Sequence, residues 1–411
     1  MANCKHFGIC GLEAIDPEGL CILHSKGPKK SKETFQKALK DRLEAKNYNF
    51  GHFYFPEETS NFSGKTLKWA DFSWATFEKE VDFRVATFEK RATFLEVNFQ
   101  GKAFFNGATF QEEVSFEVAT FEGEASFGSA TFKDKAIFRD VIFKEKADFF
   151  SATFENEADF TRGTFEGDVF FIGWDEHRLF SDKFPSYFSS VRFVQHELVR
   201  FERVNLSRVS FIQTDLRKVQ FVNVQWHRTA GRDSLFAERK VVEKWKKEKK
   251  RKEETKEEMQ LVEDLYRQLK QNFEENRNWE TAGDFHYGEM EMKRKRRSFL
   301  RDPFLWLYWF LSGYSERVWR ALGCLVFFWV GFGLFYWLSG MDTSGFHSSM
   351  PPTSQSRIFS SFLYSLKVIT FQGPYLVLLN PLGLWIQTIE SIFGAIQIAL
   401  LVLALRQRLR R

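Results

Sequence analysis

Between residues 72 and 171 the chain places a phenylalanine at every fifth or sixth position, and the two steps alternate to give a period of 11 residues. The rings are Phe72, Phe77, Phe83, Phe88, Phe94, Phe99, Phe105, Phe110, Phe116, Phe121, Phe127, Phe132, Phe138, Phe143, Phe149, Phe154, Phe160, Phe165 and Phe171. A small side chain, nearly always alanine or valine, lies two positions before each ring. Side chains two positions apart in an extended chain point to the same face. The pattern therefore predicts very short strands, each followed by a corner that keeps the ring-bearing face inward.

An 11-residue period also suits a right-handed helical coiled coil, because three turns of about 3.67 residues take up 11 positions. At about 100° per residue, however, Phe77, Val81 and Phe83 would point in widely different directions and leave no apolar stripe. The segment is also rich in Thr, Val and Phe, which favour strands. We therefore expect four short sides that close a square coil, with the rings stacked inside it.

The spacing changes after residue 171. Residues 172–193, IGWDEHRLFSDKFPSYFSSVRF, break the pattern and predict a loop or short helix on the side of the coil. A second block then keeps steps of five, at Phe201, Leu206, Phe211, Leu216, Phe221 and Trp226. Together the two blocks indicate a coil over residues 62–226.

Over residues 62–226 the sequence resembles the pentapeptide-repeat family. The resemblance implies a right-handed quadrilateral β-helix with the sixth residue bulging at alternate corners, a solenoid type commonest in bacteria. Some members are acidic DNA mimics that bind type II topoisomerases. Residues 64–171 contain 20 acidic and 13 basic side chains, and cations scattered among carboxylates imitate a phosphate backbone poorly. We therefore expect no nucleic-acid partner and assign the ladder of rings to the core.

Two long apolar runs lie in the last hundred residues, Val318–Gly340 and Leu382–Leu405. Each is long enough to span a bilayer, which takes about 20 residues. Basic residues cluster before the first run and after the second, whereas residues 341–381 between them contain only Arg357 and Lys367. By the positive-inside rule we expect a multi-pass protein of the plasma (inner) membrane with both termini in the cytoplasm.

The stretch before the first span changes character twice. Residues 227–302 are highly charged with apolar positions at helical spacing, which predicts a helical linker that folds as a hairpin. Residues 303–316 begin PFLWLYWFL, too short to span and typical of an interfacial helix. The basic run Lys293, Arg294, Lys295, Arg296 and Arg297 would lie against anionic lipid headgroups. A nucleic-acid or nuclear-localisation patch is the alternative use of such a run.

The segment 357–381 between the spans is apolar in part but is interrupted by Lys367, Gly373, Pro374 and Pro381. Irregular backbone at membrane depth is tolerated where it lines a water-filled cavity, so we expect a re-entrant pore helix and loop. The filter region would be Thr370, Phe371, Gln372, Gly373 and Pro374. Potassium channels carry T-V-G-Y-G here, and this chain has TFQGP. The sequence therefore does not support a potassium filter.

The second span carries one polar stripe. Its members recur at steps of three and four residues, which places them on one face of a helix; they are Gln387, Glu390, Gly394, Gln397 and Leu401. One interpretation is a pore lining in which a ring of Glu390 carboxylates favours cations. The alternative is that the glutamines form interhelical hydrogen bonds and that Glu390 is neutral or paired with Lys367. We predict the pore lining.

The N-terminus contains three of the four cysteines of the chain. Cys4, Cys10, Cys21 and His24 follow the spacing C-x5-C-x10-C-x2-H, with His6 as a spare ligand. Three thiolates and an imidazole suit tetrahedral zinc, and four ligands make the site structural. The alternative is four unrelated side chains in a reducing cytosol. We assign residues 1–30 to a zinc motif and residues 31–61 to a helix that caps the open coil.

The complete chain is predicted to be a multidomain β + α membrane protein, with residues 317–411 forming a two-helix transmembrane pore domain. The order of parts, with YRQLKQNFEENRNWETAGDFHYGEMEM, SLKVIT and ESIFGAIQIALLVLALRQRLRR, resembles pentapeptide-repeat proteins that carry a C-terminal ion channel domain. The resemblance implies a homo-oligomeric ion channel, a tetramer in the two-helix channel family, whose cytoplasmic solenoid senses or scaffolds a protein or ligand. A membrane-anchored scaffold and a topoisomerase-binding DNA mimic are the alternatives. We expect no enzyme, because the sequence offers no nucleophile–base pair, phosphate loop or open metal site.

Overall fold

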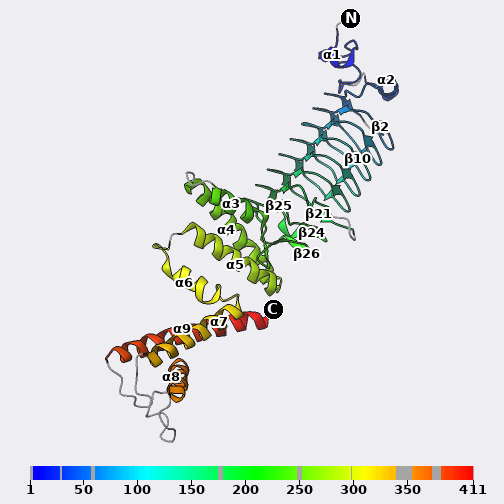
Figure 1. The fold of residues 1–411 in the computed structure, drawn as a ribbon. Coiled ribbons are helices and arrows are strands. Elements are labelled where there is room, and N and C mark those ends of the chain that lie inside the picture. The colour runs from blue at the N-terminus through cyan, green and yellow to red at the C-terminus, as the bar shows by residue number, and fades with distance from the viewer. Residues whose placement is uncertain are drawn as a thin grey trace. The chain divides into compact units, whose positions relative to one another are not determined.

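A computed structural model describes residues 3–27, 30–56, 61–174, 179–247, 252–297, 299–338, 354–372 and 381–410. The chain forms two compact units, Met1–Asn272 and Phe273–Arg411. Figure 1 shows a β-solenoid in the first unit and helices in the second.

Four parallel sheets of very short strands form the sides of the solenoid, which confirms the predicted coil. Neighbouring strands of a sheet are one coil apart, so that Thr109 pairs with Thr131. The first sheet is β1 (Tyr54–Phe55), β4 (Thr76–Phe77), β8 (Asn98–Phe99), β12 (Thr120–Phe121), β16 (Ile142–Phe143), β20 (Thr164–Phe165) and β23 (Arg192–Phe193). The second is β2 (Thr66–Leu67), β6 (Thr87–Phe88), β10 (Thr109–Phe110), β14 (Thr131–Phe132) and β18 (Thr153–Phe154).

The other two sheets complete the square. The third sheet is β3 (Ala70–Asp71), β7 (Ala92–Thr93), β11 (Val114–Ser115), β15 (Ala136–Ile137), β19 (Ala158–Asp159), β22 (Ser186–Tyr187) and β25 (Val209–Ser210). The fourth is β5 (Val81–Asp82), β9 (Ala103–Phe104), β13 (Ala125–Ser126), β17 (Ala147–Asp148), β21 (Val169–Ile172), β24 (Val199–Glu202) and β26 (Gln220–Val222). A 3-10 turn, His196–Leu198, precedes β24.

The inward phenylalanines form columns along the coil axis. Rings one coil apart are stacked, as in Phe94, Phe116 and Phe138, whose successive centroids lie 4.7 and 4.9 Å apart. Rings of neighbouring columns meet edge to face, as Phe116 does with Phe105 at 5.4 Å. Both arrangements are favourable for aromatic quadrupoles. Each of the nineteen predicted rings is at most 1% exposed, so the ladder is core.

The five-residue corners are β-turns that hold one residue in the left-handed region. In one of them Val85 has φ 57°, and the Ala86 N–H donates to the Phe83 carbonyl at 3.1 Å. This is the geometry of a type II turn, whose third residue needs a positive φ. The same conformation recurs every 11 residues from Trp74 to Arg162. The extra sixth residue therefore lies at the alternate corners, as predicted.

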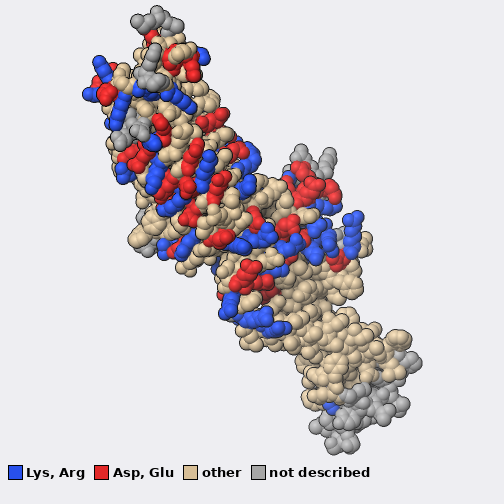
Figure 2. Space-filling model, turned by 180° about the vertical axis from the view of Figure 1, so that it is seen from behind, with Lys and Arg blue, Asp and Glu red and all other residues tan. Residues whose placement is uncertain are grey.

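The outward charged side chains pair between coils. Ion pairs join residues 22 positions apart: Lys90–Glu112, Arg91–Glu113, Lys102–Glu124, Glu117–Arg139, Glu122–Lys144, Glu124–Lys146, Lys135–Glu157 and Asp140–Arg162. Exposed pairs of this kind contribute at most about 1 kcal/mol each. Figure 2 shows the resulting mixture of blue and red side chains over the solenoid.

The chain returns to the same columns after the predicted interruption. Residues 175–178 lie outside the described part of the chain. Beyond them, Phe180 stacks on Phe154 at 5.7 Å, and Phe188 stacks on Phe160 at 4.7 Å. The strands β22 and β23 pair with β19 and β20 of the preceding coil. The ladder therefore continues after the interruption.

The solenoid also begins before the predicted boundary at residue 62. Phe50 stacks on Phe72 and Phe55 stacks on Phe77, with centroids 4.7 and 4.4 Å apart. The predicted cap over residues 31–61 is therefore shorter, and its helix is α2 (Lys32–Glu44). Phe35 of α2 is completely buried and meets the Phe55 ring edge to face at 5.6 Å. A shorter helix, α1 (Phe7–Cys10), precedes it.

Part of the predicted linker closes the C-terminal end of the solenoid. An antiparallel hairpin of β27 (His227–Thr229) and β28 (Arg232–Ser234) is followed by α3 (Phe236–Lys247) and α4 (Lys252–Glu275). The Asn272 amide of α4 donates to the carbonyls of Leu216 and Val219 at 2.7 and 2.8 Å. These bonds satisfy backbone acceptors that an open last coil would leave unpaired.

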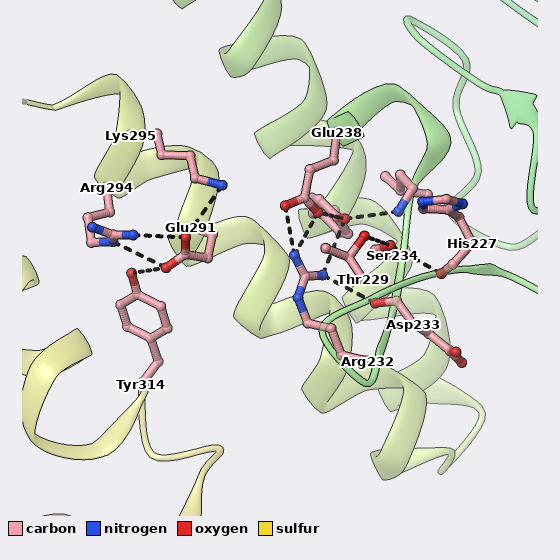
Figure 3. A network of polar contacts seen from close by, with 12 residues as sticks. His227, Thr229, Arg232, Asp233, Ser234, Glu238, Glu291, Arg294, Lys295 and Tyr314 are labelled. Atoms are coloured by element: carbon pink, nitrogen blue, oxygen red, sulfur yellow. Dashed lines mark hydrogen bonds and ion pairs between the residues drawn. The ribbon is translucent and has the colours of Figure 1, made fainter. Parts of the chain in front are cut away.

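A buried ion pair joins the hairpin to both helices (Figure 3). The Arg232 guanidinium donates to the two carboxylate oxygens of Glu238 in α3 at 2.8 and 2.6 Å. The Tyr266 hydroxyl of α4 donates to the same carboxylate at 2.5 Å. All three side chains are at most 4% exposed. Removing one partner would leave a buried charge unpaired, so the network ties the three elements together.

The second unit contains α5 (Trp279–Arg296), α6 (Pro303–Ser312), α7 (Val318–Leu338), α8 (Ser354–Ile369) and α9 (Pro381–Arg410). Two stretches are long and apolar enough to cross a membrane, Val318–Leu338 with a mean hydropathy of 1.9 and Leu384–Arg410 with 2.0. The helices α7 and α9 pack against each other, and α8 packs against both. Large apolar side chains such as Phe327 and Trp385 are 68% and 70% exposed, as expected of a surface that lipid covers.

Candidate metal centre and membrane helices

The four predicted metal ligands come together at the N-terminus. The short helix α1 ends at Cys10, and Cys4 precedes it. A tight turn, in which the backbone N–H groups of His24 and Ser25 donate to the Cys21 carbonyl, brings Cys21 and His24 to the same point. The three sulfur atoms and one histidine nitrogen all lie within 4.8 Å of one another.

The arrangement fits a tetrahedral metal ion. The Nδ1 atom of His24 lies 3.4 Å from the Cys4 sulfur and 3.1 Å from the Cys21 sulfur. Ligand atoms around tetrahedral zinc are about 3.5–3.8 Å apart, given Zn–S bonds of about 2.3 Å and Zn–N bonds of about 2.0–2.1 Å. The four side chains are between 0% and 8% exposed. The cluster can therefore hold a metal such as zinc with only small shifts.

The surroundings of His24 select the nitrogen that faces the sulfurs. The opposite nitrogen, Nε2, lies 3.3 Å from the Gly51 carbonyl and donates to it when Nδ1 carries no proton. Such a second bond fixes the tautomer of a metal-binding histidine. Burial lowers the pKa of His24 to about 4 and raises the pKa of Cys21 to about 12. A neutral imidazole is thus favoured, and thiolates need a bound cation.

The metal motif is joined to the first coil of the solenoid. The Tyr54 N–H donates to the Leu23 carbonyl at 2.9 Å. The His6 ring lies between His24 and His52, with centroid distances of 4.6 and 4.4 Å. The metal motif therefore covers the first coil together with α2, whereas the sequence assigned the cap to the helix alone.

A buried carboxylate connects α7, α8 and α9. Glu390 of α9 is 0% exposed. It accepts a hydrogen bond from the Tyr336 hydroxyl of α7 at 2.6 Å and another from the Ser365 hydroxyl of α8. The Ser365 hydroxyl also lies 3.2 Å from the Trp329 carbonyl of α7. One carboxylate thus bonds to side chains of both other helices.

The rest of the predicted pore stripe is partly buried against the same chain. A side chain on Gly394 would place its Cβ 3.2 Å from the Ile369 backbone in α8. The Gln397 amide donates to the carbonyls of Leu311 and Ala321 at 3.1 and 2.6 Å, which are the interhelical bonds of the alternative interpretation. Gln387 and Leu401 are half-buried. A pore lining by this stripe stays a prediction for the assembled protein.

The predicted filter region is described only in part. Thr370, Phe371 and Gln372 follow the end of α8 and are exposed. Gly373 and Pro374 lie outside the described residues.

Cations of the predicted headgroup run have partners within the chain, and Figure 3 shows those of Arg294 and Lys295. Arg294 donates to both oxygens of the buried Glu291 at 3.1 and 3.0 Å, and Lys295 lies 3.5 Å from the same carboxylate. Arg297 pairs with Asp302 at 2.8 Å. Burial raises the pKa of Glu291, but the interactions with Arg294 and Lys295 outweigh this effect, so the pKa lies below its ordinary value. Lipid binding by the run stays a prediction.

Residues 94–140 match the family model described as pentapeptide repeats (9 copies). No curated protein and no solved structure matched the chain. With the geometry above, the chain is a pentapeptide-repeat β-solenoid followed by a helical region that includes two long apolar helices. Sequence reasoning missed Gly51, Tyr336 and Ser365. A serine within a largely apolar helix was the one signal for Ser365, because such hydroxyls often bond to a neighbouring helix.

Proposed function

We propose that the chain is a subunit of an oligomeric ion channel, in which α7 and α9 span the membrane and α8 enters it as a pore helix. The observation that carries the proposal is the place of α8. It has 16 residues, about 24 Å of helix, which is too short for a hydrocarbon core of about 30 Å. It packs against both membrane-length helices, and this span, half-helix, span order is the plan of two-helix channels.

The charged residues that flank the two spans support a plasma-membrane protein with both termini in the cytoplasm. Arg406, Arg408 and Arg410 end α9, and the residues before α7 include Arg317. The helix α6 exposes Phe304 and Phe310 by 80% and 49%, which suits burial in the membrane interface. Membrane lipids are thus one proposed partner, and the basic run at residues 293–297 would lie near their headgroups.

In this proposal the solenoid lies in the cytoplasm and is a sensor or scaffold for a protein or ligand. Several of its carboxylates pair with cations one coil away, as Glu124 does with Lys102 and Lys146. A DNA mimic needs a run of unpaired negative charge, so the ion pairs argue against topoisomerase binding. We propose no catalytic activity. A tetramer follows from the resemblance to two-helix channels, and cation preference stays a prediction from the sequence.

Single-channel recording separates a channel from a membrane-anchored scaffold. The purified full-length chain in a planar bilayer should give discrete current steps. Gly333→Leu should abolish them, because a Cβ at Gly333 would lie 2.7 Å from the Phe362 ring of α8 and displace that helix. Gly331→Leu is the matched control, because nothing lies within 4 Å of a Cβ at that position. A folded oligomer without current would support the scaffold.

A further inference from the structure

We propose that Glu390 is a positioning residue that holds α8 between the two spans through hydrogen bonds, and that its negative charge does not contact the permeating ion. The statement about the permeating ion rests on the proposed function, whereas the packing role of Glu390 does not. It replaces the ring of pore carboxylates that the sequence predicts.

Burial and bonding carry the proposal. Glu390 is 0% exposed, and Ser365 and Tyr336 beside it are 0% and 1% exposed. A carboxylate that lined a water-filled path would keep part of its surface in water. Here both oxygens accept hydrogen bonds from hydroxyl groups of the same chain. The two hydroxyls come from α7 and α8, which pack against each other and against α9. Each bond would be lost if α8 or α7 moved away.

Close backbone contacts around the carboxylate make its position sensitive. A Cβ at Gly394, one turn after Glu390, would lie 3.5 Å from the Ile369 Cβ at the end of α8. Trp329 of α7 donates its indole N–H to the Phe362 carbonyl of α8 at 3.0 Å. At these points the backbones of α8 and α9, and of α7 and α8, lie close together. The carboxylate therefore fixes the point from which Thr370 and Gln372 leave α8.

The chemistry of the cluster predicts which substitution is tolerated. A glutamine at residue 390 retains one acceptor oxygen for the Tyr336 hydroxyl. Its amide can donate to the Ser365 oxygen, and the Ser365 hydroxyl then donates to the Trp329 carbonyl that already lies beside it. Every polar group stays satisfied without a negative charge. Alanine removes both acceptor oxygens, so the bonds from Tyr336 and Ser365 to residue 390 are lost and a cavity replaces the side chain.

The first test compares Glu390→Gln and Glu390→Ala in the detergent-solubilised full chain, with Thr388→Ala as the control. Thr388 is exposed on the same helix and bonds only locally, to the Leu384 carbonyl. We expect Glu390→Ala to lower the Tm by roughly 5 °C or more, while Glu390→Gln and the control stay within about 2 °C of wild type. A thermally neutral Glu390→Ala would overturn the proposal.

The second test reads the position of α8 directly. Cysteines at residues 369 and 394, in a Cys324→Ser background, would have Cβ atoms about 3.5 Å apart and should form a disulfide on oxidation. Linked peptides are scored by mass spectrometry. The disulfide should form with Glu or Gln at residue 390 and fall at least fivefold with Ala. Should Glu390→Ala not express, Tyr336→Phe and Ser365→Ala each remove one donor and should lower the yield partially. Equal yields in all variants would overturn the proposal.

The third test uses current and separates a positioning role from a charge role. Under a salt gradient, Glu390→Gln should keep the conductance and the reversal potential of wild type. A shift of the reversal potential toward anions, with the Tm retained, would place the carboxylate in the permeation path and overturn the proposal. Absence of current in wild type would refute the proposed channel, whereas the thermal and disulfide results would still decide the role of Glu390.

Discussion

Replacing Phe116 by alanine should reveal how much free energy one ring of the ladder contributes. Phe116 is completely buried. Rings surround it on every side within 6.2 Å between centroids: Phe94, Phe105, Phe110, Phe121, Phe127 and Phe138. Each neighbour is held in its own coil by strand pairing, so the cavity cannot collapse. Phe→Ala substitutions in cores cost about 3–5 kcal/mol, and we expect the upper half of this range.

The assay is guanidinium unfolding of residues 1–272, the first compact unit, followed by far-ultraviolet circular dichroism. Phe150→Ala is the control, because that ring is 38% exposed and lies outside the ladder. It should cost less than about 1 kcal/mol. A cost below about 2 kcal/mol for Phe116→Ala would show that the columns relax around a missing ring. The reasoning from a rigid ladder would then be refuted.

Three further outcomes are expected. The purified chain should contain about one equivalent of zinc by elemental analysis, and Cys10→Ser with Cys21→Ser should remove it and lower the Tm; unchanged stability without metal would exclude a structural site. Val85→Gly should stabilise the first unit by about 1 kcal/mol in guanidinium unfolding, because a β-branched residue is strained at φ 57°; a loss of stability would contradict the strain. Hydrogen bonds from Arg162 hold the pKa of Asp140 below its ordinary value, so their stabilisation is present above about pH 4 and lost as pH falls through the folded pKa. The difference in unfolding midpoint between wild type and Asp140→Asn should therefore narrow in acid, and a constant difference would contradict this linkage.

The solenoid was predictable because its signal is local and repeated. An 11-residue period of rings and small residues predicts which side chains face inward, and this prediction does not depend on the rest of the chain. The start of the coil was missed because the seven-residue step from Phe55 to Phe62 interrupts the five- and six-residue steps. The stacking of Phe50 on Phe72 and of Phe55 on Phe77 shows that this segment belongs to the ladder. The return of Phe188 to its column was missed for the same reason.

The candidate sites were predictable to different extents. The metal cluster needed only residue types and spacing, because Cys4, Cys10, Cys21 and His24 lie close in the sequence. Helical periodicity placed Glu390 on a polar face, but it could not say what that face meets. Tyr336 is 54 positions away and Ser365 is 25 positions away. A polar stripe can face water or a packed helix. Tertiary contacts decide between the two, and a single sequence does not contain them.

The repeat of the solenoid gives the protein an adjustable length. Coils are separated by the spacing of neighbouring strands, about 4.8 Å, and each regular coil takes 22 residues. Duplication or loss of a 22-residue segment in the middle would leave every ring above another ring, since the columns continue unchanged across the new junction. The distance between the metal motif at one end and the hairpin at the other can therefore change during evolution in equal increments of one coil. Neither end of the solenoid needs to change.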